Sequence, residues 1–119
     1  MSGVVALAVG YDPVLLQTRT QVLKSAGYTV VAEQSLKRAI ARFLEGDFDL
    51  VVLCHSISQD DRHRFADFIR GHSPRPPIVF VSSGLVQYDA SADLTIDNDP
   101  KDLIWGLREL FNEQELTSK

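Results

Sequence analysis

Unbroken runs of apolar residues recur along the chain, and each run ends at small or polar residues. The first covers residues 4–9, and another lies within residues 48–54, where the chain is apolar from Leu50 to Cys54. Neither run alternates with polar residues, which is typical of strands that are covered on both faces. Shorter runs at 28–32, 78–81 and 94–96 predict three further strands. We place the strand at 48–54 in the centre of the sheet because it is the strongest strand signal and its apolar residues run continuously.

The segments between these strands carry apolar residues at helical spacing. Asp12-Pro13 and Asp99-Pro100 each combine an N-cap residue with a proline at the first helical position, and Ser35 can cap a further helix. The predicted inward-facing residues, helix by helix, are Leu15, Leu16, Val22, Leu23 and Ala26; Leu36, Ala39, Ile40, Phe43 and Leu44; Phe65, Phe68 and Ile69; and Leu103, Ile104, Leu107, Leu110 and Phe111.

Strands that alternate with helices predict right-handed crossovers and a parallel sheet with helices on both faces. Five strands in one small domain favour the flavodoxin-like, doubly wound order 2-1-3-4-5. We therefore predict a single α/β domain over residues 1–111, followed by a polar tail over residues 112–119. Functional sites in such folds lie beyond the carboxyl ends of the strands. That rule brings Gly10, Tyr11, Cys54 and Ser82 to one crevice.

Four stretches, in order, resemble the receiver domain of response regulators, the CheY-like family. They are the first strand with its Gly10-Tyr11-Asp12-Pro13 end, the run 49–54, the segment 76–82, and the segment 100–103. The resemblance implies a role in two-component or phosphorelay signal transduction. Receivers usually have a longer connection between strands 4 and 5, so we predict that helix 4 is shortened or missing here.

The resemblance also assigns the phosphorylation site, and most of that site is missing. In the family, acids after strands 1 and 3 hold a divalent metal, one of them accepts the phosphoryl group, and a hydroxyl and a lysine assist. The matching positions here are Gly10, Tyr11, Cys54, Ser82 and Ile96. Only Ser82 keeps the family's type of side chain, and hard cations such as Mg²⁺ need oxygen ligands. We predict a degenerate, phosphorylation-independent pseudo-receiver with no enzymatic activity, no catalytic residue, no metal and no cofactor.

Composition and charge limit the cellular compartment and the class of binding partner that we expect. The net charge of −4 argues against a nucleic-acid partner. The single cysteine fits a reducing compartment, and no run approaches the roughly 18 apolar residues of a membrane span, so we expect a cytoplasmic protein. Residues 62–75 are mainly basic, and the chain from Asp89 onward is mainly acidic. Two solvated faces, or a bipolar surface that orients a partner, explain this charge pattern.

Cys54 and Trp105 offer two different routes to function. Cys54 is either a buried filler of the vacated pocket, with Tyr11 lying over it, or a thiol or small-ligand sensor. Trp105 points away from the apolar stripe of the last helix. It either folds over the gap left by helix 4, against Leu85 or Tyr88, or forms an exposed interface with them. We expect a protein partner at the face around strand 5 and the last helix: a histidine kinase, another regulator or a second copy.

Overall fold

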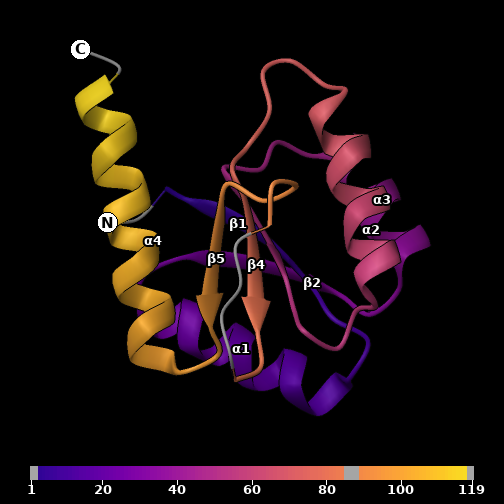
Figure 1. Cartoon of the computed structure of the whole chain (residues 1–119), viewed down its shortest axis with the longest axis horizontal. Coiled ribbons are helices and arrows are strands. Elements are labelled where there is room, and N and C mark those ends of the chain that lie inside the picture. Colours follow the sequence, from indigo (N-terminus) through magenta and orange to yellow (C-terminus); the bar gives the residue numbers. More distant parts are fainter. Residues whose placement is uncertain (1–2, 85–88, 118–119) are drawn as a thin grey trace.

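Five parallel strands form one sheet in the order β2-β1-β3-β4-β5, which confirms the predicted topology. The computed structural model describes residues 3–84 and 89–117, with side chains described up to residue 111. Helices lie on both sides of the sheet (Figure 1). The elements are β1 (Val5–Val9), α1 (Pro13–Ser25), β2 (Thr29–Glu33), α2 (Leu36–Glu45), β3 (Leu50–Leu53), α3 (Gln59–Arg70), β4 (Ile78–Ser82), β5 (Leu94–Asp97) and α4 (Pro100–Thr117).

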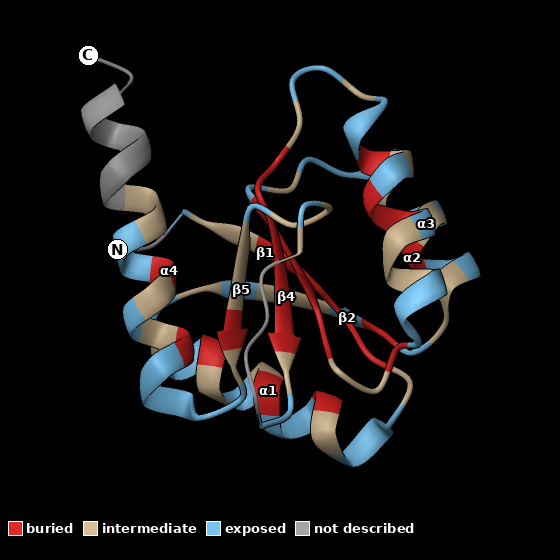
Figure 2. Cartoon of the chain, viewed as in Figure 1, coloured by how far each residue is buried: buried red, intermediate tan, exposed pale blue. Residues whose placement is uncertain are grey.

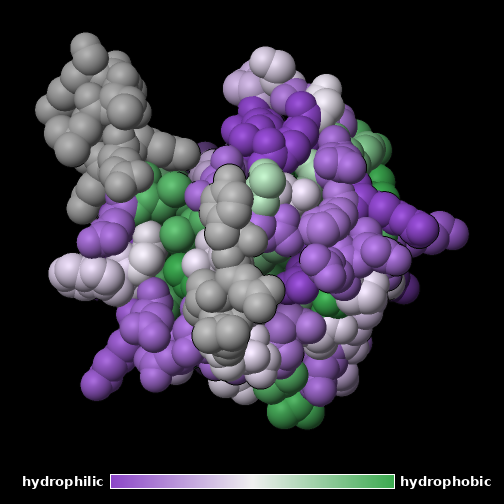
Figure 3. Space-filling view, in the orientation of Figure 1, coloured by the Kyte–Doolittle hydropathy of each residue, from purple (hydrophilic) through white to green (hydrophobic). Residues whose placement is uncertain are grey.

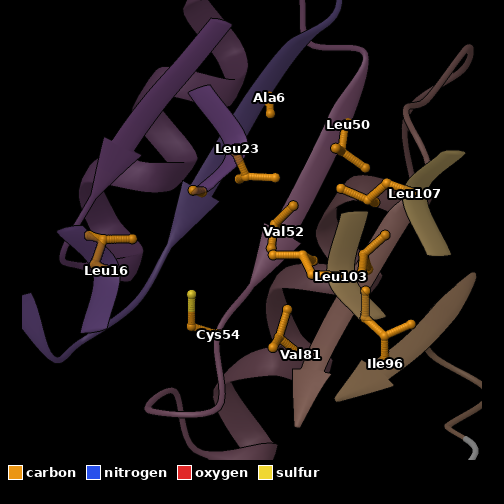
Figure 4. Close-up of a cluster of buried hydrophobic side chains, with 12 residues drawn as sticks. Ala6, Leu16, Leu23, Leu50, Val52, Cys54, Val81, Ile96, Leu103 and Leu107 are labelled. Carbon is orange, nitrogen blue, oxygen red and sulfur yellow. The ribbon is translucent and has the colours of Figure 1, made fainter. Parts of the chain in front are cut away.

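Alternate residues of the central strands enter two separate cores, which explains why their apolar runs are continuous. Figure 2 shows that the buried residues concentrate in the sheet and on the inner sides of the helices. Figure 4 shows part of the first core. On the α1–α4 face this core contains Ala6, Ala8, Leu16, Leu23, Leu50, Val52, Cys54, Val79, Val81, Ile96, Leu103 and Leu107. On the α2–α3 face the core contains Leu7, Val9, Ala39, Val51, Leu53, Ile57, Phe65, Ala66, Ile69, Ile78 and Phe80.

The predicted helix starts are confirmed by hydrogen bonds from backbone N–H groups to the capping side chains. Asp12 accepts from the N–H groups of Val14 and Leu15, at 3.0 and 3.1 Å. Ser35 accepts from Arg38 at 3.1 Å, and Asp99 accepts from Lys101 at 2.8 Å. Each cap satisfies N–H groups that have no partner inside the first helical turn.

The structure corrects two predicted helix faces. Leu44 of α2 is 61% exposed rather than inward-facing, because it lies at the outer edge of the stripe near the end of the helix. On α1 the buried residues are Leu16, Arg19 and Leu23, so an arginine occupies an inner position that the apolar pattern overlooked.

Two further predictions concern the connection between β4 and β5, where we expect helix 4 to be shortened or missing, and the end of the domain at residue 111. No helix is present in residues 83–84 and 89–93, the described parts of that connection; Leu85 and Tyr88 lie outside the described residues. Helix α4 continues to Thr117, and the division of the chain at residue 111 stays a prediction. Within the described ranges, no helix has both the length and the apolarity required to cross a membrane.

Candidate functional site

Gly10 and Cys54 lie against each other at the carboxyl ends of β1 and β3. The Cys54 N–H donates to the Val9 carbonyl at 2.9 Å, which continues the pairing of the two strands. A Cβ atom at Gly10 would lie 3.2 Å from the Cys54 Cβ and 3.3 Å from its Sγ. The absence of a side chain at Gly10 therefore lets Cys54 fill this end of the crevice, and Cys54 is 0% exposed.

Tyr11 leaves the strand end on the opposite side of the sheet. Its ring packs on the α2–α3 core, whereas Cys54 belongs to the α1–α4 core, so the predicted placement of the ring over the sulfur is wrong. The phenol donates to Asp61 Oδ2 of α3 at 2.8 Å. Burial and the neighbouring Asp61 carboxylate raise the pKa of Tyr11 to about 12. The backbone N–H groups of Tyr11 and Asp12 donate to Ser56 Oγ, at 2.9 and 3.3 Å.

The Cys54 thiol stays protonated at neutral pH. Burial raises the pKa of Cys54, and the nearby Arg19 guanidinium offsets this shift only in part. Since the thiolate is the reactive form, a protonated and fully buried thiol is a poor nucleophile. This environment favours Cys54 as a packing residue over a reactive thiol.

Ser82 and Ile96 meet at the other side of the crevice, on β4 and β5. The Ser82 hydroxyl donates to the Ile96 carbonyl at 3.3 Å. The Ile96 side chain belongs to the α1–α4 core, and its Cγ2 lies 3.0 Å from where a Cβ of Gly106 would stand. The β5 residue in register with Ser82 is Asp97. Neither Ile96 nor Asp97 supplies the cationic side chain that the family resemblance implies at this strand end.

These strand ends do not fit the divalent metal that the fold implies. Gly10 has no side chain, the Tyr11 phenol is engaged with Asp61, and the Cys54 sulfur lies in an apolar core. Asp12 uses its Oδ1 as the cap of α1. No group of three His, Cys, Asp or Glu side chains that could hold a metal ion occurs within the described ranges.

The connection between β4 and β5 is attached to α3 and to the segment after it by a row of polar contacts. His63 Nε2 lies 2.9 Å from Asp89 Oδ2, and Arg70 donates to the carbonyls of Ala90 and Ser91 at 3.0 and 3.2 Å. Figure 3 shows a largely hydrophilic surface above α3. Part of the basic stretch therefore pairs inside the molecule with the first acids of the acidic stretch, and the two interpretations of the charge pattern stay predictions.

Arg75 and Asp93 complete this row at the start of β5. The guanidinium makes two hydrogen bonds to the carboxylate, at 2.7 and 3.0 Å, and Asp93 also accepts from the Ile78 N–H at 2.7 Å. Although partial burial raises it, these bonds hold the pKa of Asp93 below its usual value. Partial burial also acts to raise the pKa of Asp89. Hydrogen bonds from the His63 ring and the Ser91 N–H outweigh burial and lower this pKa.

Trp105 lies on the surface of α4 and is 64% exposed. It borders a groove of about 410 Å³ between α1 and α4. The groove is lined by Val22, Ser25, Pro100, Lys101, Ile104, Trp105 and Arg108. Trp105 thus borders a groove that α4 shares with α1. Lys101 precedes Trp105 on the helix and Arg108 follows it, and both also line the groove.

Three residues of this region escaped the sequence analysis: Arg19, Ser56 and Asp61. Arg19 could have been found from its spacing, because it stands three residues after Leu16 and four before Leu23. Ser56 and Asp61 had no such signal. Their contacts with Tyr11 depend on how the chain after β3 turns back toward β1.

Structural comparison finds the same fold in solved receiver domains. A chain in the complex of histidine kinase ThkA with response regulator protein TrrA is matched at a TM-score of 0.78 and 20% identity, over 91% of this chain and 98% of that one. A CheY-like receiver domain protein from Methanospirillum hungatei JF-1 gives 0.75 and 21%, over 98% and 99%. Chemotaxis response regulator CheY4 of Vibrio cholerae gives 0.77 and 19%, over 91% and 98%.

No family model and no curated protein sequence matches the chain. At identities near 20%, the structural likeness establishes the fold, which is that of CheY-like response-regulator receiver domains.

Proposed function

We propose that this chain is a phosphorylation-independent pseudo-receiver that acts by protein–protein contact in two-component or phosphorelay-type signalling. The receiver fold supports the signalling role. The strand ends support the loss of phosphotransfer, because an acyl-phosphate needs a carboxylate nucleophile and Gly10, Tyr11 and Cys54 supply none. The closed packing of Gly10 on Cys54 is the observation that carries this proposal.

Beryllofluoride with Mg²⁺, a mimic of the acyl-phosphate, tests the loss of phosphotransfer. We expect no saturable change in the amide NMR signals of Gly10, Cys54 and Ser82 when both are added. Mg²⁺ alone and fluoride alone serve as controls for non-specific effects. A saturable change at these signals that requires both beryllofluoride and Mg²⁺ would overturn the proposal.

The α1–α4 groove supports a specific kind of protein partner. Trp105 supplies a large exposed aromatic surface, and aromatic residues of this kind often dominate binding energy at interfaces. Lys101 and Arg108 flank it in a protein of net negative charge. The matching partner presents an apolar side chain to the groove and carboxylates beside it. Histidine kinases, other regulators and a second copy of this chain are the candidates to test.

Trp105→Ala separates an interface from a packing role. Purified histidine-kinase dimerisation domains, other receivers and the chain itself are tested for binding by sedimentation and calorimetry. We expect Trp105→Ala to weaken the binding of one of these partners at least tenfold while unfolding stays within about 0.5 kcal/mol of wild type. Val14→Ala is the matched control, because Val14 is 70% exposed on α1. Unchanged binding in Trp105→Ala to every partner that binds the wild type would contradict the proposed interface.

The thiol sensor considered above is not the function we propose, because Cys54 is fully buried and its pKa is raised. We propose no enzymatic activity. The single cysteine supports the cytoplasm as the site of action.

A further inference from the structure

Arg19 stands where the fold of α1 calls for an apolar residue. It follows Leu16 by three positions and precedes Leu23 by four, and all three side chains are buried against the sheet. Arg19 is only 6% exposed. Arginine at this depth is rare in proteins, and it is normally accompanied by a carboxylate that pairs with its charge.

No such partner accompanies Arg19 in the described residues. None of the ion pairs there includes it, and its buried Nε–H has no hydrogen-bond acceptor. The guanidinium lies instead beside the Cys54 thiol at the end of β3. A protonated thiol is a weak acceptor and carries no charge. No carboxylate of the described residues lies within ion-pair distance of this cationic side chain.

In the part of the chain that the structure describes, two other buried side-chain nitrogen atoms lack hydrogen-bond partners, but their situations differ. Arg62 lies over the Phe80 ring, with its guanidinium carbon 5.2 Å from the ring centre, so a cation–π contact accompanies its charge. The His55 atom is the Nδ1 of an imidazole ring, which can act as a donor or as an acceptor. Of these three residues, Arg19 is therefore the strongest candidate for binding a ligand.

We propose that Arg19 and the end of β3 form a binding site for a small oxyanion, of the phosphate or carboxylate type. The planar guanidinium donates two parallel hydrogen bonds to such a group, and a poorly solvated setting strengthens them. The neighbouring strand-end positions, Gly10, Tyr11 and Cys54, carry no carboxylate that would repel the anion. The carboxylates described around the strand ends, Asp12 and Asp61, are engaged as the cap of α1 and as the acceptor of the Tyr11 phenol.

The position of Cys54 fits this site within the fold. Figure 4 shows Cys54 at the carboxyl end of β3, between Leu16 of α1 and Val81 of β4. Ligands of open α/β sheets bind beyond these strand ends. Arg19 keeps 6% of its surface exposed, and its Nε is buried. This site is independent of the Trp105 groove, so either proposal can fail without the other.

Titration of the folded protein with sodium phosphate and with sodium acetate tests the site, with sodium chloride at equal ionic strength as reference. We expect a saturable shift of the Arg19 Nε–H NMR signal, and a melting temperature higher by about 4 °C in the oxyanion near saturation. A response to phosphate alone indicates a tetrahedral oxyanion, and a response to both salts indicates a general oxyanion site. Absence of a saturable shift with both salts overturns the proposal.

Arg19→Met removes the charge and keeps the length of the side chain, and Arg38→Met makes the same change at an exposed position of α2. Sulfate- and phosphate-type salts stabilise proteins in general, so the comparison between these variants matters. We expect Arg19→Met to lose the oxyanion-dependent rise in melting temperature and Arg38→Met to keep it. An equal rise in both variants overturns the proposal, and the NMR titration of the wild type remains decisive if Arg19→Met does not fold.

Discussion

The two faces of the sheet handle their polar and aromatic groups in opposite ways. On the α2–α3 face, the rings of Phe43, Phe68 and His72 pack edge to face, with centroids 4.9–5.9 Å apart. On the same side, His63 of α3 and Arg75 after it are paired with Asp89 and Asp93 of the β4–β5 connection. On the α1–α4 face, Arg19 is buried without a partner among the described residues, and Trp105 is left on the surface.

This difference separates residues that hold the fold from residues that are available for function. Groups that are satisfied inside the molecule contribute to stability and leave little to offer a ligand. A buried cation without a counter-charge and a large exposed aromatic ring both cost stability unless something binds them. We therefore expect substitutions on the α2–α3 face to change stability, and substitutions of Arg19 or Trp105 to change binding.

The largest expected effect comes from Phe80→Ala in the α2–α3 core. Phe80 is 1% exposed, and Arg62 and His63 stack on its ring. Removing the ring leaves a cavity, so we expect the free energy of unfolding in urea to fall by about 3–5 kcal/mol. Leu44→Ala is the control, with a change within about 0.5 kcal/mol, because Leu44 is 61% exposed. A loss below about 1 kcal/mol for Phe80→Ala would show that this face does not dominate stability.

Asp93→Asn tests whether the polar contacts of this face also stabilise it. The substitution weakens two hydrogen bonds to Arg75 and one to the Ile78 N–H, and we expect a loss of about 1–2 kcal/mol at pH 7. Asp67→Asn, at an exposed position of α3, is the control. Equal stability of the two variants would mean that solvent screens the Arg75–Asp93 pair completely.

The pH dependence of the same variant gives a second measurement. The pKa of Asp93 is lowered in the folded state, so its contribution is present above the ordinary value of 3.8 and disappears as pH falls through the lower, folded value. Urea unfolding between neutral and acidic pH should therefore show the gap between wild type and Asp93→Asn narrowing below that ordinary value. A gap that stays constant over this range would contradict the role of the ionised carboxylate.

The sequence predicted the sheet and its cores well because both depend on local patterns. The continuous apolar runs, Asp12-Pro13 and Asp99-Pro100 are readable without any tertiary contact. Arg19 was missed because apolar residues alone were counted, although its spacing on α1 was visible. The contacts of Tyr11 with Asp61, and of His63 with Asp89, join positions 50 and 26 residues apart, which no local pattern specifies.

Tyr11→Phe has the smallest expected effect. It tests whether the contacts at the strand-end crevice stabilise the fold, as those of the α2–α3 face do. The Tyr11 ring stays in place while its hydrogen bond to Asp61 is lost, so we expect a loss of about 0.5–1.5 kcal/mol. The pKa of Tyr11 is raised to about 12, so the contribution of the phenol is present below the ordinary value of 10 and disappears as pH rises toward 12.

Ultraviolet difference spectroscopy across this alkaline range follows the ionisation of the phenol directly. We expect Tyr11→Phe to remove one group that titrates near 12, and Asp61→Asn to return that group toward 10, because the neighbouring carboxylate is then gone. If Asp61→Asn leaves the titration unchanged, burial alone sets the pKa. The hydrogen bond between β1 and α3 would then not stabilise the closed crevice, and the crevice would belong with the α1–α4 face as a place open to ligands.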